Sequence, residues 1–75
     1  MKILKNGAWV IHSTEVDHDC EVTLGYWHKN WPGSDSKEYV TWLTDKNGNA
    51  YLGHYFRDFF AAVNDYKERI RREKG

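Results

Sequence analysis

The sequence predicts an α+β fold, in which a four-stranded antiparallel β-meander carries one C-terminal α-helix packed across one face. Two observations lead to this prediction. Four segments rich in β-branched and aromatic residues are separated by turn residues, whereas residues 58–73 have helical periodicity. Because the connections are short, consecutive strands should pair and the helix should cover one face of the sheet. Residues 1–75 should form a single domain, near the size at which one core is barely sufficient.

The first strand is expected to follow a turn near the N-terminus. Residues 3–4 are apolar, residues 5–7 read Lys-Asn-Gly, and an apolar run resumes at Ala8. Asn followed by Gly supplies the positive φ angles of a tight hairpin turn. We therefore predict a short first hairpin whose second strand continues to about Val16. Its edge at residues 3–4 can also pair between two copies of the chain, which would give a homodimer.

The second strand is predicted over residues 20–28, where the side chains alternate between two faces. One face carries Cys20, Val22, Leu24 and Tyr26. The other face carries Glu21, Thr23, Gly25 and Trp27. Residues 29–37 then contain the only proline, a glycine and two serines, which predicts a loop. Trp31 lies in the middle of this loop, where it either covers the core or contacts a partner.

The third and fourth strands, residues 38–45 and 50–56, flank an Asn-Gly dipeptide, which is the strongest hairpin signal in the chain. Two registers are consistent with this signal. A two-residue turn sets Trp42 opposite Gly53, where the indole would cover the bare glycine backbone. A type I turn with a glycine bulge pairs Trp42 with Leu52 instead.

The helix predicted at the C-terminal end has a recognisable apolar stripe and suitable ends. The stripe consists of Phe59, Ala62, Val63, Tyr66 and Ile70. Asp58 is the expected N-cap, because its carboxylate can accept from free amides at the positive end of the helix dipole. The cations that suit the negative end are Arg69, Arg71, Arg72 and Lys74.

The aromatic content is high for so short a chain, with four tryptophans, five tyrosines and three phenylalanines. Each ring system can bury on the order of 150–250 Å², and one helix with a small sheet cannot enclose them all. We therefore expect several at the surface, on the sheet face opposite the helix, which would be left for solvent or a partner. With Cys20 as the only cysteine, no intramolecular disulfide is available to staple the fold.

The formal net charge is zero, which argues against a protein dedicated to phosphate backbones. No apolar run approaches the roughly 20 residues that span a bilayer, and residues 1–4 are too few for a signal-peptide core. We therefore expect a soluble, cytoplasmic protein that does not contact membranes. The lone cysteine is consistent with a reducing compartment.

Potential metal ligands occur in the first half of the chain, at His12, His18, Cys20 and His28. Their spacing matches no zinc-site pattern, so we expect neither a metal nor another cofactor. Nucleophilic catalysis by Cys20 is also disfavoured, because the neighbouring carboxylates should raise the pKa of its thiol. We assign no catalytic residue and expect that the protein is not an enzyme.

The surplus aromatic residues and the segregated charges favour non-catalytic binding of a macromolecule, and a protein partner above all. The predicted anchors for this partner are Trp27, Trp31, Tyr39 and Tyr55. The alternative is a single-stranded nucleic-acid-binding module in which aromatic residues of the sheet stack on bases. Its phosphate contacts would come from the basic end of the helix, at Arg69, Arg71, Arg72 and Lys74.

Residues 42–56 precede an alanine-containing helix and include Asp45, Gly48, Gly53, His54, Tyr55 and Phe56. This stretch, less than half of the chain, resembles small uncharacterised proteins encoded by bacteriophages and other mobile elements. Such proteins, where their roles are known, often bind a host complex and inhibit or redirect it. The resemblance therefore implies a phage-type inhibitor or modulator of a host complex, and it implies no active residues.

Overall fold

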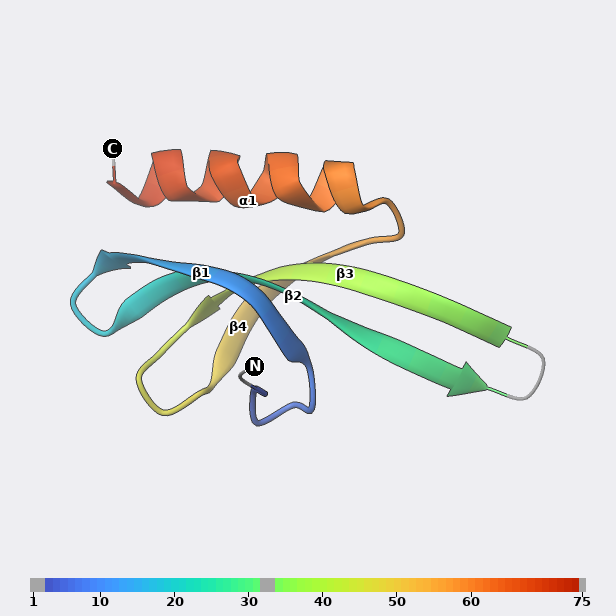
Figure 1. Ribbon diagram of the computed structural model, residues 1–75. Helices are drawn as coiled ribbons and strands as arrows, with labels where there is room; N and C mark the ends of the chain where they lie inside the picture. The colour runs from blue at the N-terminus through green and yellow to red at the C-terminus, as the bar shows by residue number, and fades with distance from the viewer. Residues whose placement is uncertain (1–2, 32–33, 75) are drawn as a thin grey trace.

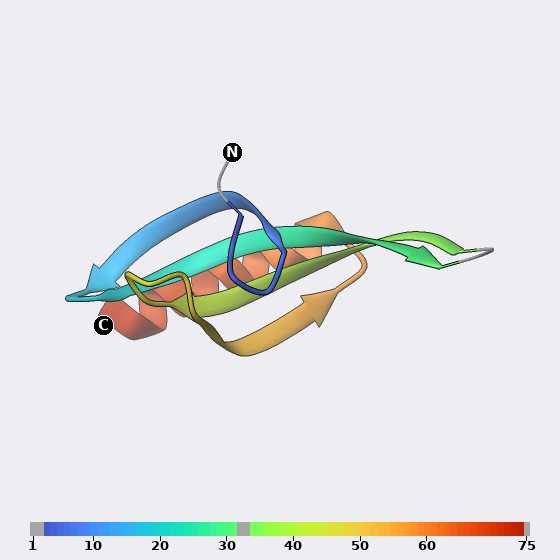
Figure 2. The ribbon, with the colours of Figure 1, turned by 90° about the horizontal axis from the view of Figure 1, so that it is seen from below.

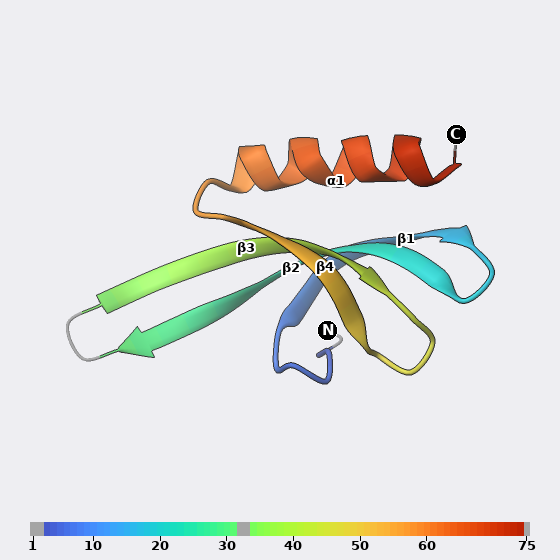
Figure 3. The same cartoon turned by 180° about the vertical axis from the view of Figure 1, so that it is seen from behind.

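The chain forms one antiparallel sheet with a helix lying across one face (Figure 1). The computed structural model describes residues 3–31 and 34–74, and only the backbone of residues 28–31 and 34–37. The strands lie in the order β1 (Trp9–Asp17), β2 (Cys20–Trp31), β3 (Ser34–Thr44) and β4 (Ala50–Phe56). The helix α1 (Phe59–Lys74) follows β4 and packs against the sheet (Figures 1 and 3). The predicted fold, a four-stranded meander with a C-terminal helix, is confirmed.

The helix begins where the sequence indicates. Oδ2 of Asp58 accepts a hydrogen bond from the backbone N–H of Ala61 at 3.2 Å, so the predicted N-cap is confirmed. The residues that α1 buries are Ala62, Tyr66 and Arg69. Arg69 was not predicted to belong to the buried stripe. In the described part of the chain, α1 lacks the length and apolar character needed to cross a membrane.

Residues 29–37 do not form the predicted loop. β2 and β3 remain paired as far as Trp31 opposite Ser34, so only two residues separate the strands. The paired strands extend beyond the rest of the sheet as an arm (Figures 1 and 2). Serine and asparagine lower strand propensity, but ladder hydrogen bonds come from the backbone, and pairing that starts in the core can continue outwards. The loop prediction was therefore wrong.

Near its turn, the β3–β4 hairpin adopts the register of a glycine bulge. Leu43 pairs with Tyr51, and Gly48 has a φ angle of +83°. The carboxylate of Asp45 fixes the turn, because Oδ1 accepts from the backbone N–H of Asn49 at 2.9 Å. The Tyr51 hydroxyl also donates to this carboxylate, at 2.6 Å. These contacts hold the pKa of the Asp45 carboxyl far below its usual value.

Beyond Leu52, β4 pairs with β3 in the other predicted register, that of the two-residue turn. Leu52 and Gly53 together oppose Trp42, and Leu52 has a φ angle of +52°, so β4 contains a bulge here. The bulge shifts the pairing by one residue, and Thr41 then pairs with His54. The indole of Trp42 lies over the glycine, since a Cβ atom on Gly53 would be 3.1 Å from Nε1. Both registers inferred from the sequence therefore occur, one on each side of Leu52.

The N-terminal segment forms less of a hairpin than predicted. Ile3 makes an isolated bridge with Trp9, and Gly7 has a φ angle of +88°, as the Asn-Gly turn requires. The backbone N–H of Lys5 points at the carbonyl oxygen of Gly48, 3.4 Å away, so the two Lys-Asn-Gly turns lie together. The edge expected to pair between copies is thus engaged within the chain.

Buried apolar side chains form one cluster on each face of the sheet. The cluster under α1 consists of Val22, Leu24, Ala62 and Tyr66. The cluster on the other face consists of Leu4, Ala8, Val40 and Trp42. The N-terminal segment therefore covers part of the face opposite the helix (Figure 2). The expectation that this face is left open is wrong at its centre, whereas the predicted alternation of β2 is confirmed.

Candidate binding surface

Most of the aromatic side chains that the structure describes are not fully buried. Within this set, only Trp42 and Tyr66 are buried, at 2% and 8% exposure. The exposed aromatic residues are Trp9, Tyr51, Tyr55, Phe59 and Phe60. For the described side chains, the expectation that one helix and one sheet cannot enclose all the rings is confirmed.

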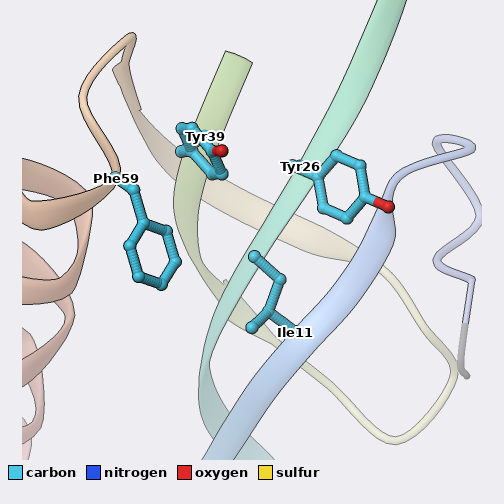
Figure 4. A pocket seen from close by; sticks show the side chains of 4 residues that line it. All are labelled: Ile11, Tyr26, Tyr39 and Phe59. Carbon is cyan, nitrogen blue, oxygen red and sulfur yellow. The ribbon is translucent and has the colours of Figure 1, made fainter. Parts of the chain in front are cut away.

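Several of these rings surround an open cavity of about 350 Å³ on the helix side of the sheet, beside the first turn of α1 (Figure 4). The cavity, which we call the aromatic hollow, is lined by Ile11, Tyr26, Tyr39 and Phe59. Tyr39 and Phe59 meet edge to face, with ring centroids 5.3 Å apart. Tyr26 and Tyr39 lie at 6.3 Å with a tilted arrangement. Three ring systems and one aliphatic side chain thus provide most of its wall.

Each wall residue is placed by a local feature of the chain. Tyr26 and Tyr39 are direct cross-strand partners on β2 and β3, so both side chains project from the same face. Phe59 is the first residue of α1, where the cap at Asp58 fixes the direction of the helix. Ile11 lies where β1 slips by one residue against β2. The hollow therefore depends on β1, β2, β3 and α1 together.

Phe60 stands at the edge of this hollow. Its side chain is 73% exposed, the highest value among the large hydrophobic residues that the structure describes. Its ring centroid lies 5.9 Å from that of Phe59, which lines the hollow. Successive helical residues point about 100° apart, so Phe59 can face the sheet while Phe60 faces water. An exposed ring of this size next to a cavity is typical of a contact surface.

A second aromatic group lies on the face opposite the helix. The indole of Trp27 packs edge to face on Trp42 at 5.7 Å, and its Nε1–H donates to Oε1 of Glu38 at 2.9 Å. Tyr55 lies 6.4 Å from Trp27 and is 56% exposed. This group is held by the core and presents the Tyr55 ring to solvent.

The four predicted anchors are therefore not brought together. Trp27 and Tyr55 share the face opposite α1, whereas Tyr39 lies in the aromatic hollow on the helix side. The side chain of Trp31 is outside the described part of the chain, and its backbone ends β2 in the arm. The sequence gives the number of available rings but not their division between the two faces.

Arg69 does not belong to the cationic surface that the nucleic-acid alternative requires. It is 7% exposed and lies between α1 and the sheet. Its Nη1 donates to the backbone oxygen of Thr41 at 2.9 Å and to Oγ1 of the same residue at 3.1 Å. Burial is the main cause that lowers the pKa of its guanidinium. The assignment of Arg69 as a phosphate contact is corrected, because its donors serve the core.

The hydroxyl of Thr41 that accepts from Arg69 also contacts the carboxylate of Asp65. Oγ1 of Thr41 donates to Oδ2 of Asp65 at 2.5 Å, and Nδ1 of His54 lies 3.0 Å from the same oxygen. Burial alone would raise the pKa of the Asp65 carboxyl. Hydrogen bonds from Thr41 and His54, together with the charges of His54 and Arg69, have the larger effect, so the pKa is lowered overall. Asp65 is therefore held as an ionised acceptor that ties α1 to β3 and β4.

The other predicted phosphate contacts, Arg71, Arg72 and Lys74, are exposed at the C-terminal end of α1. The aromatic hollow lies at the other end of this helix, which is roughly 24 Å long at 1.5 Å per residue. The helix runs back towards the β1–β2 turn, where the negative charge of Glu73 raises the pKa of the Cys20 thiol (Figure 1). The rings of the aromatic hollow and these three cations thus lie at opposite ends of α1.

The groups considered for metal binding and catalysis are engaged or scattered. Burial, together with the negative charges of Glu73, Asp17 and Glu21, raises the pKa of the Cys20 thiol, in the direction expected from the sequence. Nδ1 of His12 lies 3.0 Å from the hydroxyl of Tyr66. Among residues 3–27 and 38–74, whose side chains are described, no three His, Cys, Asp or Glu residues come together as a metal site would need.

Four residues of the candidate surface were not assigned to it from the sequence: Ile11, Tyr26, Phe59 and Phe60. Tyr26 was placed only on one face of its strand. Phe59 was assigned to the buried stripe, but it is exposed and forms part of the wall of the hollow. Phe60 carried a usable signal, because two adjacent phenylalanines on a helix cannot both face the core. Ile11 carried none, since its position depends on a register slip in β1.

Comparison of the chain with protein-family models, with curated proteins and with solved structures gives no match. Function is therefore to be inferred from the chemistry of the surface itself.

Proposed function

We propose that this chain is a non-catalytic binding protein whose aromatic hollow, with Phe60 at its edge, holds an apolar side chain of a protein partner. The supporting observation is an open cavity of about 350 Å³ that is lined by two tyrosines, a phenylalanine and an isoleucine. Such cavities are the usual binding sites of proteins, and aromatic anchors dominate interface energies. Tyr39 already packs against Phe59, so part of the wall is ordered before binding, which reduces the entropic cost.

A protein partner is favoured over single-stranded nucleic acid by the positions of the charges. Proteins that bind single strands place aromatic rings and cations along one groove. Here the predicted phosphate contacts Arg71 and Arg72 lie at the other end of α1 from the hollow, and Arg69 is bonded to Thr41. The exposed cation beside the hollow, Arg57, is followed directly by the carboxylate of Asp58, so no run of cations follows the rings. The nucleic-acid alternative therefore has less support. In keeping with the resemblance of residues 42–56 to phage-encoded proteins, we propose that the partner belongs to a host complex that the protein inhibits or redirects.

Affinity capture with matched variants tests this proposal. Immobilised wild-type chain and its Phe60→Ala and Tyr55→Ala variants would each be exposed to nuclease-treated host extract, and bound proteins quantified by mass spectrometry. We expect wild type to retain a partner that Phe60→Ala retains at least about tenfold less well. Tyr55→Ala, which removes an exposed ring on the other face, should retain it fully.

Both variants change exposed side chains, so both should keep the wild-type melting temperature, and this is the control for folding. Equal capture by wild type and Phe60→Ala would contradict the assignment to the hollow. Loss of capture with Tyr55→Ala alone would assign binding to the face that carries Trp27 and Tyr55. In a separate assay without extract or nuclease, retention of labelled single-stranded DNA or RNA would support the nucleic-acid alternative.

A further inference from the structure

The patch beside the first turn of α1 carries both a projecting ring and a cavity that such a ring would fit. Phe60 is 73% exposed, and it is not among the residues that line the hollow of its own chain. The hollow measures about 350 Å³, near the lower end of the roughly 300–1,000 Å³ range of ligand pockets. That volume has room for one large side chain. The two halves of a knob-and-hole contact therefore lie side by side on one surface.

A two-fold symmetric pair uses such a surface twice. In an isologous contact, residue i of one copy meets residue j of the other, and j meets i in return. A knob that adjoins its hole is suited to this arrangement, because one rotation inserts each knob into the opposite hole. The contact closes on itself and leaves neither Phe60 ring in water.

The charges next to the patch are also self-complementary. Arg57 and Asp58 are both exposed and directly precede Phe59. Two-fold symmetry can set Arg57 of one copy against Asp58 of the other, and it does so twice. Asp58 would keep its capping role, since the cap uses only Oδ2. The formal net charge of zero adds no long-range repulsion between copies.

We infer that a second copy of this chain occupies the aromatic hollow, with Phe60 of each copy inserted between Ile11, Tyr26, Tyr39 and Phe59 of the other. This inference rests on the proposed function, because it uses the same hollow as a protein-binding site: the second copy occupies it in the free protein, and the host partner displaces that copy. It replaces the pairing of residues 3–4 as the route to a homodimer, since Ile3 is bridged to Trp9 within the chain. One small patch on each copy predicts a weak, concentration-dependent dimer.

Sedimentation equilibrium from micromolar to millimolar protein tests the inference. Wild type should pass from monomer to dimer, and Phe60→Ala should weaken the dimer at least about 100-fold, because two anchors are lost per dimer. Tyr55→Ala, an exposed ring outside the patch, should leave the dissociation constant within about twofold of wild type. Arg57→Glu should weaken the dimer more at low salt than at high salt.

A mixing experiment distinguishes this contact from other dimers. Ile11→Glu places a charge in the hollow but keeps Phe60, whereas Phe60→Ala keeps the hollow. Each variant alone should be monomeric, and an equimolar mixture at millimolar concentration should form a heterodimer with one of the two contacts. A mixture that stays monomeric would overturn the arrangement.

A wild-type chain that sediments as a monomer throughout would overturn the inference but not the proposed function. In that case, a partner captured by wild type and lost with Phe60→Ala still assigns the hollow to a different protein. If wild type dimerises through Phe60 while capture is unaffected by Phe60→Ala, the second copy is retained and the separate host partner at this site is rejected.

Discussion

Arg69 of the helix donates from Nη1 to both the backbone oxygen and the hydroxyl of Thr41 on β3, at 2.9 and 3.1 Å. The Thr41 hydroxyl in turn donates a hydrogen bond to Oδ2 of Asp65, which lies one helical turn before the arginine. The helix that carries Phe59 and Phe60 is therefore tied to the sheet by a polar contact as well as by its apolar stripe. The position of the aromatic hollow depends on this attachment.

Replacement of Arg69 by methionine should destabilise the fold by about 2 kcal/mol, because charged hydrogen bonds to Thr41 are lost while Asp65 keeps its charge. The matched control is Arg71→Met, which removes the same group where the side chain is 76% exposed. This control should change stability by less than about 0.5 kcal/mol. Urea unfolding followed by circular dichroism measures both. Equal effects would mean that the buried arginine contributes no more than a surface one.

The lowered pKa of Asp65 predicts a stability that falls with acid. The unfolded chain takes up a proton near the ordinary aspartate pKa of about 3.9, whereas the folded chain does so only at lower pH. In that interval the unfolded state binds more protons, so the free energy of unfolding decreases as pH falls. The contribution is fully present above about pH 5 and is lost as pH passes through the folded value.

The variant Asp65→Asn isolates this contribution from that of Asp45, whose pKa is also lowered. We expect the difference in unfolding free energy between wild type and Asp65→Asn to be constant near neutral pH and to shrink steadily below about pH 4. Glu68→Gln, a change of the same charge on the same helix, is the control. A difference that is independent of pH would show that Asp65 does not titrate as described.

Two glycines differ in the space available to a side chain. A Cβ atom at Gly25 would lie 2.5 Å from the backbone oxygen of Trp9 and 2.8 Å from Cζ3 of Trp42. At Gly53 the nearest atoms are at 3.1 Å, including Nε1 of the same indole. Gly25→Ala should therefore cost about 3 kcal/mol and Gly53→Ala about 1 kcal/mol or less. Chemical denaturation ranks the two, and the reverse order would contradict the described packing of Trp42.

Leu52 has a φ angle of +52° and is 69% exposed. Its backbone conformation should therefore affect the stability of the fold more than its side-chain contacts do. In an ordinary strand, alanine is favoured over glycine, but a left-handed conformation reverses this preference. Leu52→Gly should be more stable than Leu52→Ala by about 1 kcal/mol. Thermal unfolding of the pair decides it. Greater stability of the alanine variant would place the bulge of β4 elsewhere.

Local signals were sufficient for most of the fold. The Asp58 cap and the spacing of Ala62 and Tyr66 predict α1, and the Asn-Gly turn predicts β4 with its observed bounds. Residues 29–37 were misassigned because turn-forming residues dominate their composition, whereas their pairing continues a ladder that begins in the core. Such an effect is tertiary and leaves no periodic signal.

The sequence predicted that aromatic residues would be exposed, but not which of them would form the candidate surface. Arg69 is seven residues after Ala62 and three after Tyr66, so its place on the stripe is present in the spacing, although its charge suggested the surface. Tyr39 was among the predicted anchors and lines the hollow, but its packing against Phe59 depends on where the helix starts over the sheet. The slip of β1 that brings Ile11 to the hollow has no sequence signature.

The most direct test of the central claim, that the aromatic hollow is the protein-binding surface, is hydroxyl-radical footprinting of the chain with and without its captured partner. Oxidation at Tyr39, Phe59 and Phe60 should fall at least about fivefold in the complex, since rings in an interface core are shielded from water, while Tyr55 should remain labelled. Protection of Trp27 and Tyr55 with unchanged labelling of Phe60 would contradict the account.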